Sequence, residues 1–140
     1  MNGINYFSFL ITALIPIIIG FVYYQKMIFG EIWYDTISMP KDQRIRLQKG
    51  NAFCISFLVC LCITIFLFFN CNAVGQEGAH DTFKHGAFHG LGLAILIVIP
   101  ISITGVLYNE RSWKNMFVNA GYWLISLTLM GGIIDYMNHL

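Results

Sequence analysis

Residues 52–69 read AFCISFLVCLCITIFLFF, a stretch of eighteen residues that contains no charged side chain. A helix that crosses the hydrocarbon core of a bilayer needs about 20 mostly apolar residues, because the core is about 30 Å thick and a helix rises about 1.5 Å per residue. Inside lipid the backbone must satisfy its own hydrogen bonds, so the stretch is expected to be helical. It therefore predicts a membrane-spanning helix.

Three further apolar runs, residues 6–24, 87–108 and 116–136, have the same character, and the four runs together use 80 of the 140 residues. The first run has no basic segment before it and no small-residue cleavage site after it, which favours a retained helix over a cleaved signal peptide. We therefore predict an all-α fold: an integral membrane four-helix bundle in which residues 1–140 form one transmembrane domain.

The composition supports this fold class. Hydrophobic residues make up 57% of the chain and charged residues 11%, whereas an average soluble domain has about 45–50% and about 25%. The formal net charge is +1 and the mean hydropathy is +0.67. These values exclude a disordered chain and a nucleic-acid binder that depends on basic charge. A soluble bundle is disfavoured because none of the four runs carries a wide polar face.

The basic residues predict how the helices are oriented. Seven of the eight Lys and Arg residues follow the first or the third run: Lys26, Lys41, Arg44, Arg46, Lys49, Arg111 and Lys114. Only Lys84 lies between the second run and the third. Basic loops stay in the cytoplasm, so we expect the first and third connecting segments there and both termini on the other side.

Aromatic residues and one connecting segment add detail at the membrane surface. The predicted interface anchors are Trp33, Trp113 and Tyr136, because Trp and Tyr gather at headgroup level. In the first cytoplasmic segment, Pro40 suits a first helical turn, and Asp42 and Arg46 are spaced to pair on one helix face. A short interfacial helix and a solvated loop are both compatible with this segment.

Glycines predict where helices touch. Gly86 and Gly90 are four residues apart, and Gly20, Gly131 and Gly132 lie within the first and fourth runs. Helices in lipid associate through close backbone approach, which glycine permits. These five residues are predicted to pack helix against helix, either within the chain or against another protein.

One cluster of polar residues is a candidate metal-binding site. Asp81, His85 and His89 are spaced four apart, and so are Asp135 and His139. Residues four apart share a helix face, and the short third connection favours neighbouring third and fourth helices. Five candidate ligands would then meet at the outer membrane boundary, where a divalent metal could bind His nitrogen and carboxylate oxygen.

Other interpretations of these histidines remain open. Histidines near an interface often have a purely structural role with a solvated tip, and a proton-linked role is a further alternative. Haem held by a histidine pair would need ligands at similar depth on facing helices. No nucleophile-elbow or phosphate-loop motif occurs in the sequence. The middle of each run carries no charge, which disfavours an ion pump.

Two segments carry a family resemblance. Residues 20–33 read GFVYYQKMIFGEIW, and residues 109–114 read NERSWK, followed by Gly121-Tyr122 and Met130-Gly131. The chain resembles the bacterial membrane-protein family catalogued as domain of unknown function 1761, whose members carry comparable aromatic and glycine patterns. The resemblance implies four helices and a location in the bacterial cytoplasmic membrane. It implies no activity and no catalytic residues, and it assigns no role to the histidine cluster.

These observations favour a small non-enzymatic membrane protein, an accessory or scaffolding subunit that packs against a larger complex. Its expected partners are membrane lipid and either other membrane subunits or further copies of itself, with no nucleic acid and no cofactor. One alternative is a metal- or haem-binding protein that uses the outer histidines. Another is a small oligomeric transporter of solute or protons, which internal repeat symmetry would favour.

Overall fold

The computed structural model describes residues 4–36, 51–72, 82–109 and 112–138, and this part of the chain is helical, with no strand. The elements are α1 (Tyr6–Tyr23), η1 (Lys26–Gly30), α2 (Glu31–Asp35), α4 (Asn51–Cys71), α5 (Phe83–Leu93), η2 (Ala94–Val98), α6 (Ile99–Tyr108) and α7 (Trp113–Met137). The two η elements are π-helical. The interfacial helix predicted near Pro40 lies outside the described residues.

Among the described residues, four helical stretches are long and apolar enough to cross a membrane: Tyr6–Tyr23, Asn51–Cys71, Phe83–Tyr108 and Trp113–Met137. The first two agree closely with the predicted runs, whereas the third and fourth begin three to four residues earlier than predicted. Thr82 explains the earlier third start, because its side chain accepts a hydrogen bond from the backbone N–H of His85 and caps the helix. Hydropathy marks the apolar part of a helix, while a polar cap marks its first turn.

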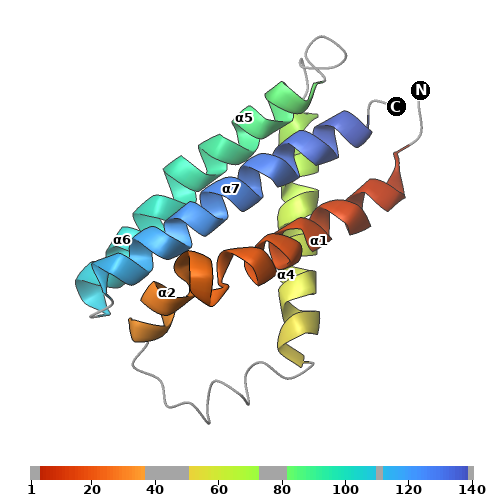
Figure 1. Ribbon diagram of the computed structural model, residues 1–140. Helices are drawn as coiled ribbons and strands as arrows, with labels where there is room; N and C mark the ends of the chain where they lie inside the picture. Colours follow the sequence, from red (N-terminus) through yellow and green to blue (C-terminus); the bar gives the residue numbers. More distant parts are fainter. Residues whose placement is uncertain (1–3, 37–50, 73–81, 110–111, 139–140) are drawn as a thin grey trace.

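α7 is the central helix of the fold. It runs between α1 on one side and the continuous α5–η2–α6 rod on the other, and α4 crosses these helices at a steep inclination (Figure 1). Residues from three of these elements form the main apolar core: Leu67, Ala94, Leu127, Met130 and Ile134. Because α7 has neighbours on several sides, it is the most buried of the four candidate spans.

The third span contains a π-helical turn close to a proline. Pro100 has no backbone N–H, so it leaves a carbonyl one turn earlier without its usual partner. η2 lies directly before this position, and its widened turn is closed by a hydrogen bond from the Ile99 N–H to the Ala94 carbonyl. The Ser102 hydroxyl also donates to the Val98 carbonyl at 2.7 Å. The irregularity is therefore accommodated within the helix.

Polar contacts tie α1 to α7 at both ends. At one end, the Asn138 side chain accepts a hydrogen bond from the backbone N–H of Asn5 at 3.1 Å and donates to the Ser8 hydroxyl at 2.9 Å. At the other end, the buried Tyr23 hydroxyl donates to the Val118 carbonyl at 3.0 Å. These contacts set the register of the two helices.

Tyr23→Phe is expected to destabilise the protein by about 0.5–1.5 kcal/mol, the net value of one hydrogen bond. The ring still packs on α7, so only the bond to the Val118 carbonyl is lost. Tyr6→Phe is the matched control, because Tyr6 is 77% exposed. Thermal unfolding in detergent measures both variants, and equal unfolding temperatures would contradict the role given to Tyr23.

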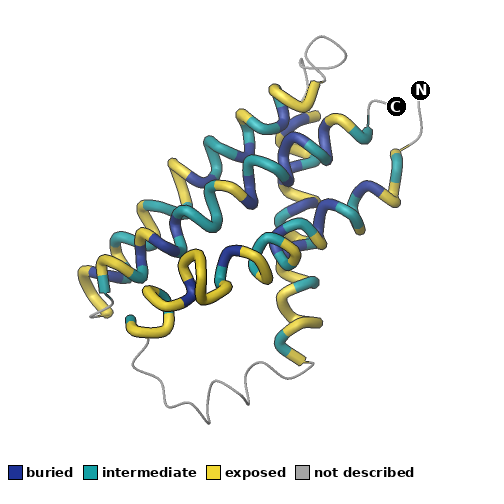
Figure 2. Tube along the Cα trace, viewed as in Figure 1, coloured by how far each residue is buried: buried dark blue, intermediate teal, exposed yellow. Residues whose placement is uncertain are grey.

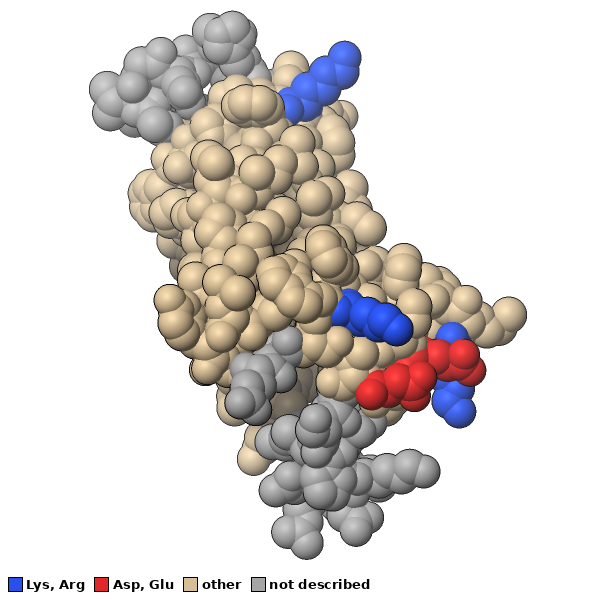
Figure 3. Space-filling view, turned by 90° about the vertical axis from the view of Figure 1, so that its left-hand side faces the viewer, with Lys and Arg blue, Asp and Glu red and all other residues tan. Residues whose placement is uncertain are grey.

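α4 is packed along only part of its length. Its C-terminal half carries the buried residues Cys60, Thr64, Leu67 and Cys71. Between Asn51 and Val59 no residue is buried, and this half stands apart from the other helices (Figures 1 and 2). The surface seen in Figure 3 carries charged side chains toward its two ends, with an uncharged belt between them. Such a belt suits a membrane-embedded surface.

Candidate functional site

The candidate site is built on an unusually close contact between α5 and α7. A Cβ atom added at Gly86 would collide with the backbone carbonyl of Gly131, and one added at Gly90 would collide with the carbonyl of Leu127. Gly131 meets the Gly86 carbonyl in the same way. The two helices therefore touch backbone to backbone, which only glycine allows at these positions.

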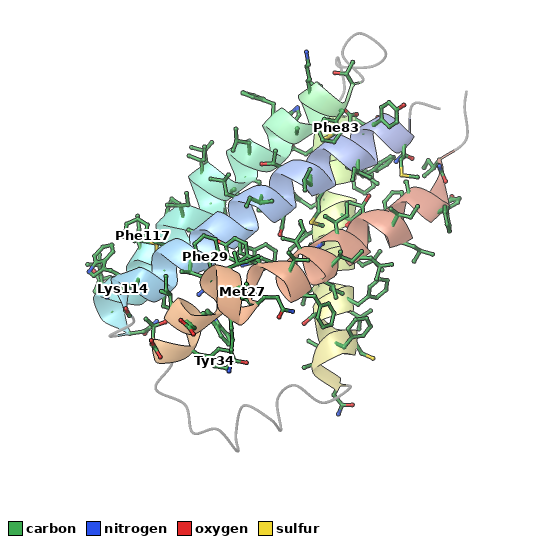
Figure 4. All side chains as sticks on the ribbon, in the orientation of Figure 1. Met27, Phe29, Tyr34, Phe83, Lys114 and Phe117 are labelled. Atoms are coloured by element: carbon green, nitrogen blue, oxygen red, sulfur yellow. The ribbon has the colours of Figure 1, made fainter. Side chains whose placement is uncertain are left out.

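The other predicted packing glycines contribute differently. A Cβ at Gly132 would lie 2.5 Å from the Phe83 ring, and Figure 4 shows Phe83 where the start of α5 lies over α7. A Cβ at Gly20 would lie 3.6 Å from the Tyr122 ring, which is ordinary van der Waals contact. Gly132 thus makes room for an aromatic ring, while Gly20 is under no steric demand.

Three predicted site residues meet beside this glycine contact. Nδ1 of His85 lies 3.0 Å from Oδ2 of Asp135, and Nε2 of His85 lies 3.1 Å from Nε2 of His89. The two imidazole rings are nearly perpendicular, with an interplanar angle of 78° and centroids 4.6 Å apart. The three side chains form one hydrogen-bonded row from α7 across the first two turns of α5.

The glycine contact also decides how closely the carboxylate approaches. A Cβ at Gly86 would lie 2.5 Å from the Cβ of Asp135, so a side chain there would push Asp135 away from His85. The carboxylate accepts a hydrogen bond from the Nδ1–H of His85. A neutral His85 then presents a lone pair at Nε2, toward His89.

Asp135 is the most deeply buried charged residue of the described chain, with 1% of its surface exposed. Its Oδ1 atom has no hydrogen-bond partner among the described residues. His85 is partly open, with 15% of its side chain exposed, and His89 is half-buried. A buried carboxylate on a membrane-spanning helix is costly unless it has a partner, and such groups are commonly functional.

Only three of the five predicted metal ligands lie within the described residues, namely His85, His89 and Asp135. Asp81 and His139 lie outside the described residues. Asp135 faces Nδ1 of His85 and so stands on the far side of that ring from His89. Within the described ranges, no group of three or more His, Cys, Asp or Glu side chains is arranged to hold one ion. The convergence of all five ligands stays a prediction, because two of them lie outside the described residues.

The geometry also bears on the haem alternative. Two axial ligands lie on opposite faces of a haem, each about 2 Å from the iron by analogy with other metal–nitrogen bonds, and so about 4 Å apart. The Nε2 atoms of His85 and His89 are only 3.1 Å apart on one helix face. This pair is not arranged as the two axial ligands of a single haem.

Comparison with known families gives a match over most of the chain. The model of a family described as a protein of unknown function, DUF1761, matches residues 7–134. The chain belongs to this family. No curated protein and no solved structure matches it. The family assignment confirms the resemblance carried by the aromatic and glycine segments, and it assigns no role to the row formed by Asp135, His85 and His89.

At the opposite end, this DUF1761 protein has a large open groove of about 770 Å³. It lies between α1 with the following η1 and α2 on one side and the exposed half of α4 on the other. Its lining includes Tyr24, Trp33, Ala52, Ser56, Cys60 and Tyr122. The sequence does not predict this groove, because the groove depends on the crossing angle of α4, which hydropathy does not encode.

The predicted anchors differ in their surroundings. Trp33 packs against Tyr24, with ring centroids 5.2 Å apart, and lines the groove. Trp113 and Tyr136 are 50% and 54% exposed at the two ends of α7. The exposure of the latter pair suits interface anchors, whereas Trp33 is partly engaged within the protein.

A polar chain holds α2 against α7 beside the groove. The Tyr24 hydroxyl donates to Oδ1 of Asn119 at 2.7 Å, and Nδ2 of Asn119 donates to Oδ1 of Asn115 at 2.7 Å. Nδ2 of Asn115 then donates to the Thr36 hydroxyl at 3.1 Å. This side of the groove is therefore preformed, while the α4 side is a single helix that has no neighbour along its N-terminal half among the described residues.

Proposed function

We propose that this DUF1761 protein is a small non-enzymatic subunit of a membrane complex, and that its groove takes one transmembrane helix of a different membrane protein. The observation that carries the proposal is the unpaired half of α4, which continues a helix-packing face beyond the point where its own chain covers that face. The proposal includes a location in the bacterial cytoplasmic membrane.

The packing face of α4 consists of small residues at four-residue spacing: Ala52, Ser56, Cys60 and Thr64. Cys60 and Thr64 are buried against the rest of the protein. Ala52 and Ser56 belong to the same stripe and line the groove. Because small residues let helix backbones approach closely in lipid, the open part of the stripe offers the same kind of contact to another helix.

The opposite wall of the groove supports a protein partner. Tyr24, Trp33 and Tyr122 present aromatic rings there, and aromatic residues are enriched at protein interfaces. The polar chain through Asn119 and Asn115 already holds this wall in place. A partner helix would therefore order little more than α4 itself, which lowers the entropic cost of association.

A transporter is less well supported by the described residues. The polar row of Asp135, His85 and His89 lies toward one end of the molecule, and the groove lies at the other. The main apolar core includes Leu67, Leu127 and Met130, and the buried polar residues of the described chain also include Thr12, Thr64 and Ser126. These three hydroxyl side chains carry no charge, which disfavours an ion pathway.

Site-specific photo-crosslinking in native membranes tests the proposal. A photoreactive residue at Ser56 lies in the groove, and one at Leu58 lies on the outward face of α4, where Leu58 is 59% exposed. We expect Ser56 to give one discrete adduct heavier than the 15.9 kDa chain that contains a second membrane protein. Leu58 is expected to give no such adduct.

Competition by a bulky side chain sharpens the test. Ser56→Leu narrows the groove and is expected to abolish co-purification of the crosslinked partner, while Leu58→Phe leaves it unchanged. An adduct that contains two copies of this chain would overturn the proposal in favour of a homodimer. Lipid adducts alone would overturn it in favour of a groove filled by lipid.

A further inference from the structure

We propose that the Nε2 atoms of His85 and His89 form a two-nitrogen site for a divalent transition-metal ion, with Asp135 positioning His85 from the far side of its ring. This inference goes beyond the proposed subunit function and does not depend on it. It rests on the geometry of the row Asp135–His85–His89 and on the burial of its carboxylate.

The spacing of the two nitrogens suits chelation. With metal–nitrogen bonds of about 2.0–2.1 Å, an ion that touches both Nε2 atoms at their observed separation of 3.1 Å would subtend an angle of about 100°. This value lies between the angles of octahedral and tetrahedral coordination. Histidines one helical turn apart therefore reach one ion without movement of the backbone.

Asp135 prepares one of the two ligands. By accepting the Nδ1–H of His85 at 3.0 Å, the carboxylate holds the proton on that nitrogen. The Nε2 lone pair of His85 faces Nε2 of His89 at 3.1 Å, and a metal ion binds both nitrogens by replacing the proton between the two rings, which is released to water. A carboxylate behind a metal-binding histidine is the usual outer contact in protein metal sites, where it fixes the tautomer and raises ligand basicity. Asp135 is thus a positioning residue and not a ligand.

The charge of the site supports a cation. Asp135 is 1% exposed, and its Oδ1 atom has no hydrogen-bond partner among the described residues. A metal ion on the other side of His85 would place positive charge on the imidazole that faces this carboxylate. The buried negative charge then has a counter-charge, which a neutral histidine alone does not provide.

The site is rigid and accessible. The backbone contact of Gly86 and Gly90 with α7 fixes α5 beside Asp135, so the backbone that carries both imidazole rings is held in place. His85 keeps 15% of its side chain exposed, and both histidines lie within the first two turns of α5. An ion can therefore enter from the aqueous end of the helix, and water completes its coordination.

The donor set indicates which ions bind. Imidazole nitrogen suits Zn²⁺, Ni²⁺ and Cu²⁺, whereas Mg²⁺ and Ca²⁺ prefer oxygen ligands. The test therefore titrates the full-length protein, purified in detergent through a tag without histidine, with Zn²⁺ and Ni²⁺ by calorimetry. Mg²⁺ serves as the negative control, and elemental analysis after dialysis measures the bound metal per chain.

Three variants separate chelation from folding. His89→Ala removes one ligand from a half-buried position and is expected to weaken Zn²⁺ binding at least tenfold. The combination of Ala87→His with His89→Ala keeps the number of histidines but places the second one on a different helix face, and it is expected to bind as weakly as His89→Ala. Asp135→Asn is expected to weaken binding about 10–100-fold.

The outcomes are distinct. One ion per chain in the wild type, together with the loss in both His89 variants, supports the site. Wild-type protein that binds no Zn²⁺ or Ni²⁺ at millimolar metal overturns it. Binding that is unchanged when His89 is displaced also overturns it, because the ion would then be held elsewhere. Size-exclusion chromatography establishes that each variant remains folded and monodisperse.

Discussion

Gly90→Ala is expected to cause one of the largest losses of stability available from a single methyl group in this protein. The added Cβ would collide with the Leu127 carbonyl, and a carbonyl on a buried helix cannot move aside without displacing α7. Overpacking of this kind costs about 1–3 kcal/mol. The loss would appear as a lower thermal unfolding temperature in detergent.

Gly92→Ala is the matched control for this prediction. Gly92 lies on the same helix two residues away, and a Cβ there would meet nothing within 4 Å. Both variants gain the same intrinsic helix preference of alanine over glycine, about 1 kcal/mol, so their difference reports the helix contact alone. Gly92→Ala should be neutral or stabilising. If the two variants unfold at the same temperature, α5 and α7 do not touch as the structure places them.

His85→Leu is expected to destabilise the protein by about 1–3 kcal/mol, the cost of leaving a buried hydrogen-bond acceptor without its partner. The variant leaves Asp135 buried with neither carboxylate oxygen bonded within the described residues, since Oδ2 loses His85 and Oδ1 has no partner there. Asp135→Leu is expected to cost less, because His85 keeps some contact with water.

The double variant His85→Leu with Asp135→Leu completes a thermodynamic cycle. Replacing both members of a buried hydrogen-bonded pair by apolar residues of similar shape can be nearly neutral, so the double variant is expected to recover most of the stability lost in His85→Leu. Unfolding temperatures of the wild type and the three variants, measured in one detergent, give the coupling energy. If the two single losses simply add in the double variant, the pair is not coupled.

Hydropathy predicts the positions of the membrane spans but not all of their ends. The runs 6–24 and 52–69 agree with α1 and α4, because a helix in lipid must be apolar along its length. The starts of α5 and α7 were predicted three to four residues too late, since their first turns contain polar residues such as Lys84 and Lys114. The capping role of Thr82 for α5 accounts for the helical residues that hydropathy leaves out.

For the histidine cluster, too, the sequence predicts which residues lie close together but not how they contact one another. Four-residue spacing predicted that His85 and His89 share a helix face, and the short connection between the third and fourth helices predicted that Asp135 lies near them. The spacing could not show which ring nitrogen Asp135 contacts, and this point separates a third ligand from a positioning carboxylate. That distinction depends on how closely α5 approaches α7, and the close approach requires glycine at position 86.

The helical class, the four spans, the glycine pairs and the family can all be predicted from the sequence, because each depends on local composition and residue spacing. Only the tertiary structure decided that α7 is central, that α4 leaves one half uncovered beside a groove, and that Asp135 is buried behind His85. Those features depend on crossing angles and on how closely two backbones approach. In lipid these are set by side-chain packing between helices, since hydropathy is similar on every face.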